Sequence, residues 1–123
     1  MPDRNRILLV DDDQDTCELM SLMLTLASDD YEVTAAGSAV EALALIRKKQ
    51  FDIYILDSLL PDMSGIELCS KIRQHDRQIP ILFYSGKAEI NYIGKAKSAG
   101  ATEYLVKPND LDRFTDTVRK YLG

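Results

Sequence analysis

The sequence lacks the features that mark several classes of protein. It has no tryptophan, one histidine and only two cysteines, and Cys17 and Cys69 match neither a zinc-binding nor a CxxC spacing. We therefore expect both cysteines to be small core residues in a reducing compartment. No apolar run approaches the roughly 18 residues of a membrane span, and no apolar signal segment follows Met1. These absences predict a cytoplasmic protein that uses neither disulfides nor a membrane.

The balance of charge excludes further partners. Fifteen lysines and arginines stand against twenty aspartates and glutamates, so the net charge at pH 7 is −5. Because an acidic surface repels phosphate groups, we expect no direct binding to nucleic acid and none to an anionic membrane. The 123 residues match the usual length of one domain, and no linker, repeat or low-complexity tract divides them. We therefore predict a single domain over residues 1–123.

Short apolar runs alternate along the chain with amphipathic stretches. The apolar runs predict five strands, at residues 7–10, 31–36, 53–56, 79–84 and 104–106. Apolar residues with the helical period of about 3.6 predict helices near residues 17–27, 38–44, 66–72, 90–96 and 111–121. Ser38 and Glu41 form a capping box at the start of the second helix, and Gly100 is expected to end the fourth. This alternation predicts an α/β fold, with a doubly wound parallel sheet covered by helices on both faces.

Charged and hydroxyl side chains follow four of the predicted strands. Three aspartates at residues 11–13 follow the first strand, Asp57 the third, Ser85 the fourth and Lys107 the fifth. Ligands of open α/β sheets bind beyond the carboxyl ends of the strands, where the strand order reverses. If the order is 2-1-3-4-5, Asp11, Asp12 and Asp57 share one crevice. We expect Asp13 to cap the first helix instead.

Three carboxylates in one crevice repel one another, and each resists ionisation unless a cation is near. A hard divalent ion relieves that repulsion, and Mg²⁺ suits it because it binds few carboxylates together with water and phosphate oxygens. Lys107 can balance a further negative group, and Ser85 can donate a hydrogen bond to one. An aspartate is also a competent nucleophile for phosphorus. The residues therefore predict a site for a phosphoryl group.

The ordered set of motifs resembles the receiver domain of two-component response regulators, from the first strand to the last helix. The matching segments are LVDD at residues 9–12, ILD at 55–57, LPDMSG at 60–65, YSG at 84–86, GA at 100–101 and YLVKP at 104–108. The resemblance implies the flavodoxin-like receiver fold, with five strands in the order 2-1-3-4-5 and five helices. A stand-alone receiver and a receiver cut from a longer protein both fit the sequence.

The resemblance implies roles for the acidic residues. Asp57 would be the phosphoacceptor. Asp11, Asp12 and Asp57, together with the backbone carbonyl of Leu59, would hold Mg²⁺. On this interpretation the crevice predicted from the strand ends is both the metal site and the site of phosphorylation.

The resemblance also implies how the protein senses the phosphoryl group. Lys107 would contact that group, and its peptide bond to Pro108 would be cis, which aims the lysine inward. Ser85 would be the switch hydroxyl, in place of the commoner threonine, and Tyr104 the aromatic side chain that rotates with it. The chain departs from the family at residues 109–110, which lack the usual aromatic and which we expect to cap the last helix.

Two further hypotheses concern rate and docking. Leu59 and Lys87 stand two residues beyond the phosphoacceptor and the switch hydroxyl. The resemblance to receivers implies that side chains at these two positions border the approach of water. A bulky leucine and a cation there predict slow loss of the phosphoryl group. Leu19, Leu22 and Leu26 form a stripe offset by about 100° from the core stripe of the first helix. The stripe predicts a patch at which Leu19 and Leu22 dock a partner's helices; the alternative is that this helix is broadly buried.

The function that the resemblance implies is a phosphorylation-switched signalling module, rather than an enzyme with a separate substrate. It would take a phosphoryl group from the phosphohistidine of a sensor histidine kinase or a histidine phosphotransfer protein. It would catalyse only its own phosphorylation and dephosphorylation. It would then control a downstream effector through the face formed by the fourth helix, the fifth strand and the fifth helix.

Several alternatives fit the sequence less well. An aspartyl-phosphate phosphatase uses D-x-D-x-T/V after the first strand, whereas residues 13–17 read DQDTC. A flavin carrier needs a phosphate-cradling loop where this chain has acids. A calcium loop starting at Asp11 fails because Thr16 and Leu22 stand where it needs Gly and Glu. A degenerate receiver used only for docking would have lost an acidic, serine or lysine position, and none is lost.

Overall fold

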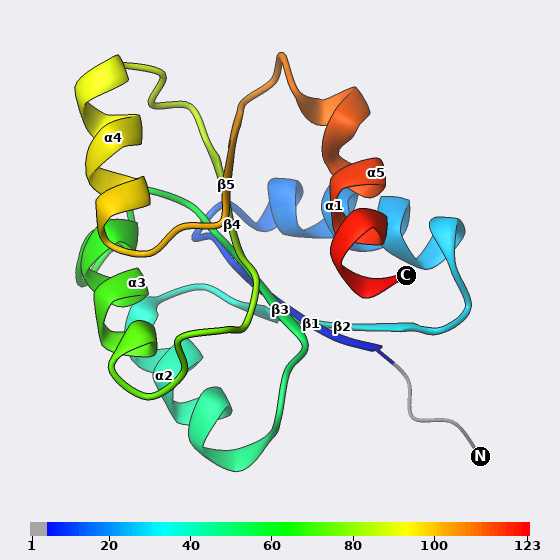
Figure 1. Ribbon diagram of the computed structural model, residues 1–123. Helices are drawn as coiled ribbons and strands as arrows, with labels where there is room; N and C mark the ends of the chain where they lie inside the picture. The colour runs from blue at the N-terminus through cyan, green and yellow to red at the C-terminus, as the bar shows by residue number, and fades with distance from the viewer. Residues whose placement is uncertain (1–4) are drawn as a thin grey trace.

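Five parallel strands form one sheet at the centre of the molecule, in the order β2-β1-β3-β4-β5 (Figure 1). The computed structural model describes residues 5–123. The strands are β1 (Asn5–Val10), β2 (Tyr31–Ala36), β3 (Ile53–Leu56), β4 (Ile81–Ser85) and β5 (Glu103–Val106). The helices are α1 (Gln14–Ala27), α2 (Ala39–Lys48), α3 (Gly65–Arg73), α4 (Ile90–Ser98) and α5 (Leu111–Leu122). The predicted fold class, strand order and alternation of elements are all confirmed.

Three strands differ from the prediction at their ends, and the first of them, β1, begins at Asn5 rather than at residue 7. The fourth strand begins at Ile81 rather than at residue 79, because Pro80 has no N–H to donate to the sheet. The same strand ends at Ser85, whose backbone pairs in register with Val106. The fifth strand begins one residue early because Glu103 pairs with Leu82. Ser85 therefore belongs to a strand and is held by the sheet itself.

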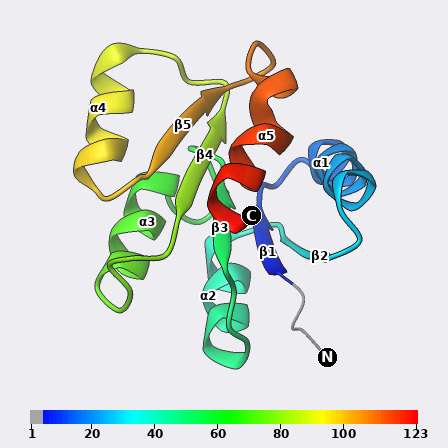
Figure 2. The same ribbon diagram turned by 45° about the vertical axis from the view of Figure 1, so that its right-hand side comes forward.

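The helices form two layers, one on each face of the sheet (Figures 1 and 2). On one face, α2, α3 and α4 cover a core that includes Leu8, Val10 and Phe83. On the other face, α1 and α5 cover a core that includes Ile7 and Leu9. Successive residues of β1 thus enter opposite cores, which explains why its sequence is continuously apolar. Among the described residues, no helix is both long and apolar enough to cross a lipid bilayer.

The helix caps largely follow the prediction. Asp13 caps α1 through the backbone N–H of Asp15, and Ser38 caps α2 through that of Glu41. The Glu41 carboxylate accepts in return from the N–H of Gly37 at 2.7 Å, one residue earlier than in a standard capping box. Gly100 follows α4 with a φ of 115°, the left-handed conformation that ends many helices.

The predicted capping role of residues 109–110 is only partly right. Asp110 occupies the N-cap position of α5 but makes no side-chain cap bond, because its backbone is not extended (φ −98°, ψ 13°). Its carboxylate instead accepts from the backbone N–H of Val106 at 2.8 Å and pairs with Arg113 at 3.2 Å. Asp110 therefore stabilises the turn between β5 and α5.

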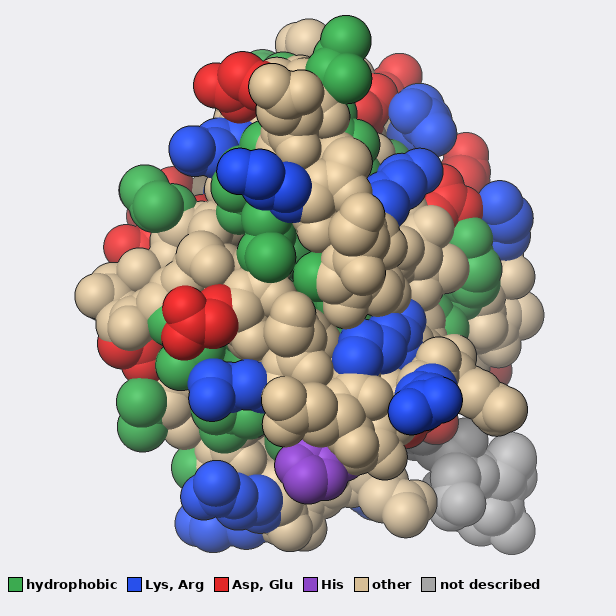
Figure 3. All heavy atoms as spheres, turned by 60° about the vertical axis from the view of Figure 1, so that its left-hand side comes forward, with side chains coloured by type: hydrophobic (Ala, Val, Ile, Leu, Met, Phe, Trp, Pro, Cys, Tyr) green, Lys and Arg blue, Asp and Glu red, His purple; other side chains and the backbone are tan. Residues whose placement is uncertain are grey.

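The two cysteines lie where the sequence predicts them. Cys17 and Cys69 are free and buried, and burial raises the pKa of each thiol to about 11. The neighbouring charge of Asp11 adds to the effect at Cys17. Both thiols are therefore protonated at neutral pH and unreactive. His75 is exposed just beyond α3, and Figure 3 shows the histidine side chain at the surface of this face, among lysine and arginine side chains.

Candidate functional site

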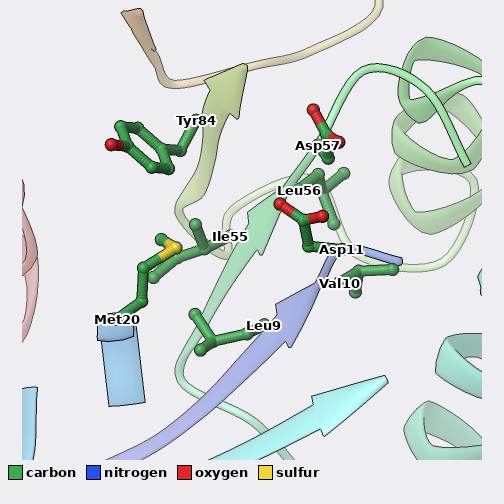
Figure 4. Close-up of a pocket in the computed structure, with 8 residues that line it drawn as sticks. All are labelled: Leu9, Val10, Asp11, Met20, Ile55, Leu56, Asp57 and Tyr84. Carbon is green, nitrogen blue, oxygen red and sulfur yellow. The ribbon is translucent and has the colours of Figure 1, made fainter. Parts of the chain in front are cut away.

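The carboxyl ends of β1 and β3 bring three acidic side chains together. Val10 and Leu56, the last residues of these strands, pair directly in the sheet, so Asp11 and Asp57 leave it side by side. One carboxylate oxygen from each of Asp11, Asp12 and Asp57 lies within 4.8 Å of the others. Figure 4 shows the carboxylates of Asp11 and Asp57 beyond the tips of their strands, next to the apolar side chains that line the pocket. The predicted acidic crevice is confirmed.

Lys107 reaches this crevice from the end of β5. Its Nζ donates a hydrogen bond to Oδ2 of Asp11 at 2.7 Å and lies 3.6 Å from Oδ2 of Asp57. The Lys107–Pro108 peptide bond is cis, as the resemblance implies. The other oxygen of Asp11 accepts from the backbone N–H of Asp13 at 2.9 Å. Asp11 is thus oriented by a cation on one oxygen and by the start of α1 on the other.

The electrostatics of the crevice are unbalanced. Burial raises the pKa of Asp57, and the nearby charge of Asp11 raises it further, while Lys107 and the N–H of Ser58 act in the opposite direction. Burial alone lowers the pKa of Lys107, but its hydrogen bond to Asp11 and the charge of Asp57 outweigh burial and raise that pKa. The crevice therefore holds one ammonium and three carboxylates. A second cation beside Asp57 would stabilise its ionised form.

The donor set fits a hard divalent ion. Three carboxylates offer oxygen ligands within one small volume, and their oxygens are the ligands that Mg²⁺ prefers. A hollow of about 290 Å³ lies beside them and is lined by Asp11, Asp12 and Gln14, among others. The metal-binding role of the Leu59 carbonyl stays a prediction; the Leu59 side chain is 66% exposed.

The predicted switch residues meet at the backbone of Lys87. Ser85 is completely buried, and its hydroxyl accepts from the N–H of Lys87 at 3.1 Å. The hydroxyl of Tyr104 donates to the carbonyl of the same residue at 2.6 Å. The ring of Tyr104 stacks on Phe83 with the centroids 5.4 Å apart. Ser85 and Tyr104 therefore share one peptide segment, through which movement of one can reach the other.

The Lys87 side chain contacts an aromatic ring of α4. Its Nζ sits 4.9 Å from the centroid of the Tyr92 ring, in a cation–π contact. Pairing of Lys87 with a phosphoryl group stays a prediction.

The leucine stripe of α1 is exposed. Leu19, Leu22 and Leu26 are 46%, 55% and 77% exposed, whereas Met20 and Leu24 are buried. The alternative that the helix is buried on most sides is therefore wrong, and the two stripes are separate. Docking of a partner on this surface stays a prediction.

Sequence reasoning missed three residues that shape the site. Ser58 is buried, and its hydroxyl shares a hydrogen bond with that of Ser85. Tyr92 of α4 donates to the Ser58 carbonyl at 3.2 Å. Asp62 caps α2 from the loop after β3 by accepting from the N–H groups of Ala39 and Val40 at 2.9 and 2.8 Å. The position of Ser58 directly after Asp57, and that of Asp62 within the LPDMSG motif at residues 60–65, could have drawn attention to these two.

The chain is similar to known receivers in sequence. Residues 7–119 match the family model of the response regulator receiver domain. The chain is 36% identical to transcriptional regulatory protein ZraR of Salmonella typhimurium, over 95% of the chain and 26% of the relative. It is 30% identical to sporulation initiation phosphotransferase F of Bacillus subtilis, over 95% and 93%. The chain thus spans about a quarter of the first relative and nearly all of the second.

Solved structures show the same similarity. Chemotaxis protein CheY4 of Vibrio cholerae superposes with a TM-score of 0.88 at 31% identity, covering 97% of this chain and 99% of that one. Response regulator protein TrrA of Thermotoga maritima, in complex with Mg²⁺-BeF, has a TM-score of 0.84 at 32% identity, over 96% and 99%. The similarity extends over nearly the whole of each chain.

Proposed function

The chain belongs to the response regulator receiver domain family, and we propose that it accepts a phosphoryl group on Asp57. Receiver domains are phosphorylated by histidine kinases and regulate effectors. The observation that carries the proposal is the convergence of Asp11, Asp12 and Asp57 within 4.8 Å, with Lys107 bound to one of these carboxylates and close to another. The donor would be the phosphohistidine of a sensor histidine kinase or of a histidine phosphotransfer protein.

The reaction is a displacement at phosphorus. A carboxylate oxygen of Asp57 attacks, a P–O bond forms, and the P–N bond of the donor breaks, with its electron pair passing to the imidazole nitrogen. Lys107 keeps its charge because its pKa is raised, chiefly by Asp11 and Asp57 against the opposing effect of burial. Its ammonium can pair with the phosphoryl oxygens. Hydrolysis by water later restores Asp57, so no separate substrate is turned over.

The site residues suit Mg²⁺ as a cofactor. Asp11, Asp12 and Asp57, with the carbonyl of Leu59, would hold the ion. When bound, Mg²⁺ neutralises negative charge on the carboxylates and on the incoming phosphoryl group. The structure of the relative TrrA is a complex with Mg²⁺ and a beryllium fluoride, which supports the same chemistry here.

Phosphorylation of Asp57 would change the face formed by α4, β5 and α5 through Ser85 and Tyr104. The Ser85 hydroxyl would donate to a phosphoryl oxygen, and Tyr104 would follow through the Lys87 backbone that both residues contact. Both residues adjoin the face formed by α4, β5 and α5. We propose that an effector protein binds there, in a cytoplasmic pathway without direct contact to nucleic acid.

The phosphodonor would dock on the exposed stripe of α1. This helix begins at Gln14, directly after the aspartates of the crevice. At a rise of about 1.5 Å per residue, Leu19 and Leu22 lie within roughly 8–12 Å of the start of the helix. Apolar side chains at that distance can hold a partner helix while its histidine reaches Asp57.

Intact-mass analysis tests the proposed function. The wild-type chain should gain about 80 Da, the mass of one phosphoryl group, on incubation with acetyl phosphate and Mg²⁺. The gain should be absent in Asp57→Asn and in wild type treated with a chelator. A gain of the same size in Asp57→Asn would show that another residue is modified and would overturn the proposal.

A further inference from the structure

The hydroxyl of Ser85 is already occupied within the protein. Ser85 is 0% exposed and Ser58 is 2% exposed, and their Oγ atoms share a hydrogen bond. The Ser85 hydroxyl also accepts from the N–H of Lys87 at 3.1 Å. Neither of these bonds goes to Asp57. The proposed switch hydroxyl is therefore held by a neighbour of the phosphoacceptor rather than by the phosphoacceptor itself.

Ser58 is a rigid partner because the rest of the residue is also held. Its N–H donates to Oδ1 of Asp57 at 2.8 Å. Its carbonyl accepts from the N–H of Gly65 at 2.8 Å and from the hydroxyl of Tyr92 at 3.2 Å. Because the N–H, the carbonyl and the hydroxyl of Ser58 are all hydrogen-bonded, its side chain is held pointing toward Ser85 at the end of β4. The Ser58 hydroxyl therefore offers Ser85 a hydrogen-bonding partner whose position is fixed.

We propose that Ser58 is a positioning residue that stabilises Ser85 in its resting place, and so sets how strongly a phosphoryl group must bind to switch the protein. This inference rests on the proposed function of Asp57. A phosphoryl oxygen can only accept, so the Ser85 hydroxyl must turn its single proton toward that oxygen and away from Ser58, whichever hydroxyl donates in the resting bond. Its bond to an anionic oxygen is charge-assisted and stronger than a bond between two hydroxyls. On phosphorylation, the Ser85 hydroxyl can therefore exchange its bond to Ser58 for one to the phosphoryl oxygen. The loss of the bond to Ser58 makes the switched state less stable than it would be without that resting bond.

Movement of Ser85 also costs free energy at Ser58. The hydroxyl of Ser58 bonds to that of Ser85, it also interacts with the hydroxyls of Tyr92 and Tyr104, and the residue is buried. When Ser85 moves, the Ser58 hydroxyl loses one of these partners in a site with little access to water, which costs free energy. Removing the hydroxyl abolishes both the resting bond and this cost. Loss of the resting bond and loss of this cost both favour the switched state.

The test is a comparison of affinities for beryllofluoride, a mimic of the phosphoryl group. Affinity would be measured with Mg²⁺ present, by amide NMR titration, in wild type, Ser58→Ala, Ser85→Ala and the double variant Ser58→Ala/Ser85→Ala. Ser58→Ala should bind about two- to tenfold more tightly than wild type, the range expected for one net hydrogen bond. In the Ser85→Ala background, the same change should have a much smaller effect, because the bond between Ser58 and Ser85 no longer exists.

Controls separate this role from general effects. Thr117→Ala removes another buried hydroxyl, which bonds to the Arg113 carbonyl at 2.8 Å within α5, and should bind as wild type does. Ser58→Cys fills the same space with a weaker hydrogen-bonding group and should shift the affinity in the same direction as Ser58→Ala, which keeps the test open if the alanine variant folds poorly.

The outcomes divide clearly. Weaker or unchanged binding in Ser58→Ala, or an effect of the same size in the Ser85→Ala background, would overturn the role of Ser58. Binding by wild type that is lost in Asp57→Asn supports the proposed function whatever the Ser58 variants do. Failure of wild type to bind would instead overturn the proposed function, and with it the inference that rests on it.

Discussion

Nζ of Lys107 lies 2.7 Å from Oδ2 of Asp11, although 96 positions separate the two residues in the sequence. The same Nζ is 3.6 Å from Oδ2 of Asp57. In the unphosphorylated protein, the lysine therefore neutralises part of the acidic cluster that a phosphoryl group would enter. The ammonium serves the resting site and is also well placed to bind phosphoryl oxygens.

Lys107→Met should slow phosphorylation of Asp57. The change removes the ammonium while keeping an unbranched side chain of similar length, so the phosphoryl oxygens lose a charged partner. Such hydrogen bonds contribute about 1.5–3 kcal/mol, which corresponds to a rate at least about tenfold lower. Intact mass followed over time with acetyl phosphate measures the rate. Lys95→Met, at an exposed position on α4, is the matched control and should react as wild type does.

Asp57→Asn should stabilise the folded protein at neutral pH. The raised pKa of Asp57, due mainly to burial and then to Asp11, means that ionisation costs stability. The stability that the neutral carboxyl provides is fully present below the ordinary pKa of 3.8 and is lost as the pH rises through the folded pKa. The variant should therefore unfold at a higher temperature than wild type near neutral pH, and the difference should shrink in acid. Thermal unfolding over pH checks this, with exposed Asp116→Asn as control; equal stability near pH 7 would contradict it.

Gly65→Ala should destabilise the loop that carries Asp57. A Cβ on Gly65 would lie 2.1 Å from the backbone oxygen of Asp57, so the backbone must shift. Overpacking of this kind costs about 1–3 kcal/mol or more. Gly94→Ala is the matched control, because its Cβ would meet nothing within 4 Å and alanine favours a helix by about 0.5–1 kcal/mol. In denaturant unfolding, the free energy of unfolding should fall for Gly65→Ala and rise for Gly94→Ala.

Leu19→Glu and Leu22→Glu should slow phosphorylation by a protein donor but not by acetyl phosphate. The small donor needs only the crevice, whereas a protein donor must also bury the exposed leucines on α1. Val40→Glu, at a position on α2 that is 64% exposed, controls for the added charge. The comparison is the ratio of the two rates in each variant. A ratio equal to that of wild type in both leucine variants would show that α1 does not dock the donor.

Leu59→Asn and Lys87→Ala should each speed loss of the phosphoryl group. Leucine cannot hold an attacking water by a hydrogen bond, whereas asparagine can. Removal of Lys87 takes away a cation that can leave the Tyr92 ring and shield the phosphoryl oxygens. Phosphate release after removal of the donor measures both lifetimes, with Lys97→Ala as control. Unchanged or slower release in both variants would refute shielding by these side chains.

Much of the fold follows from the sequence because its causes are local. The apolar runs that form β1 and β3 are continuous, so they predict strands buried on both faces. Asp13 and Ser38 cap helices through donors two or three residues away, a range that a sequence pattern can reveal. Even the acidic crevice could be expected, since parallel strands end at a common edge and Asp11 and Asp57 each follow one.

The tertiary structure alone decided which side chains meet across that edge. The bond between Ser58 and Ser85 joins the loop after β3 to the end of β4, and their approach depends on the pairing of β3 with β4 and on the close packing at Gly65. The contact of Tyr92 with Ser58 depends on how α4 lies over the sheet. A hydrogen bond needs its two atoms within about 3 Å, and segments distant in the chain reach that precision only after the whole core has packed. For that reason the sequence determined the residues that form the phosphorylation site, while the packed fold determined how Ser85 is held there.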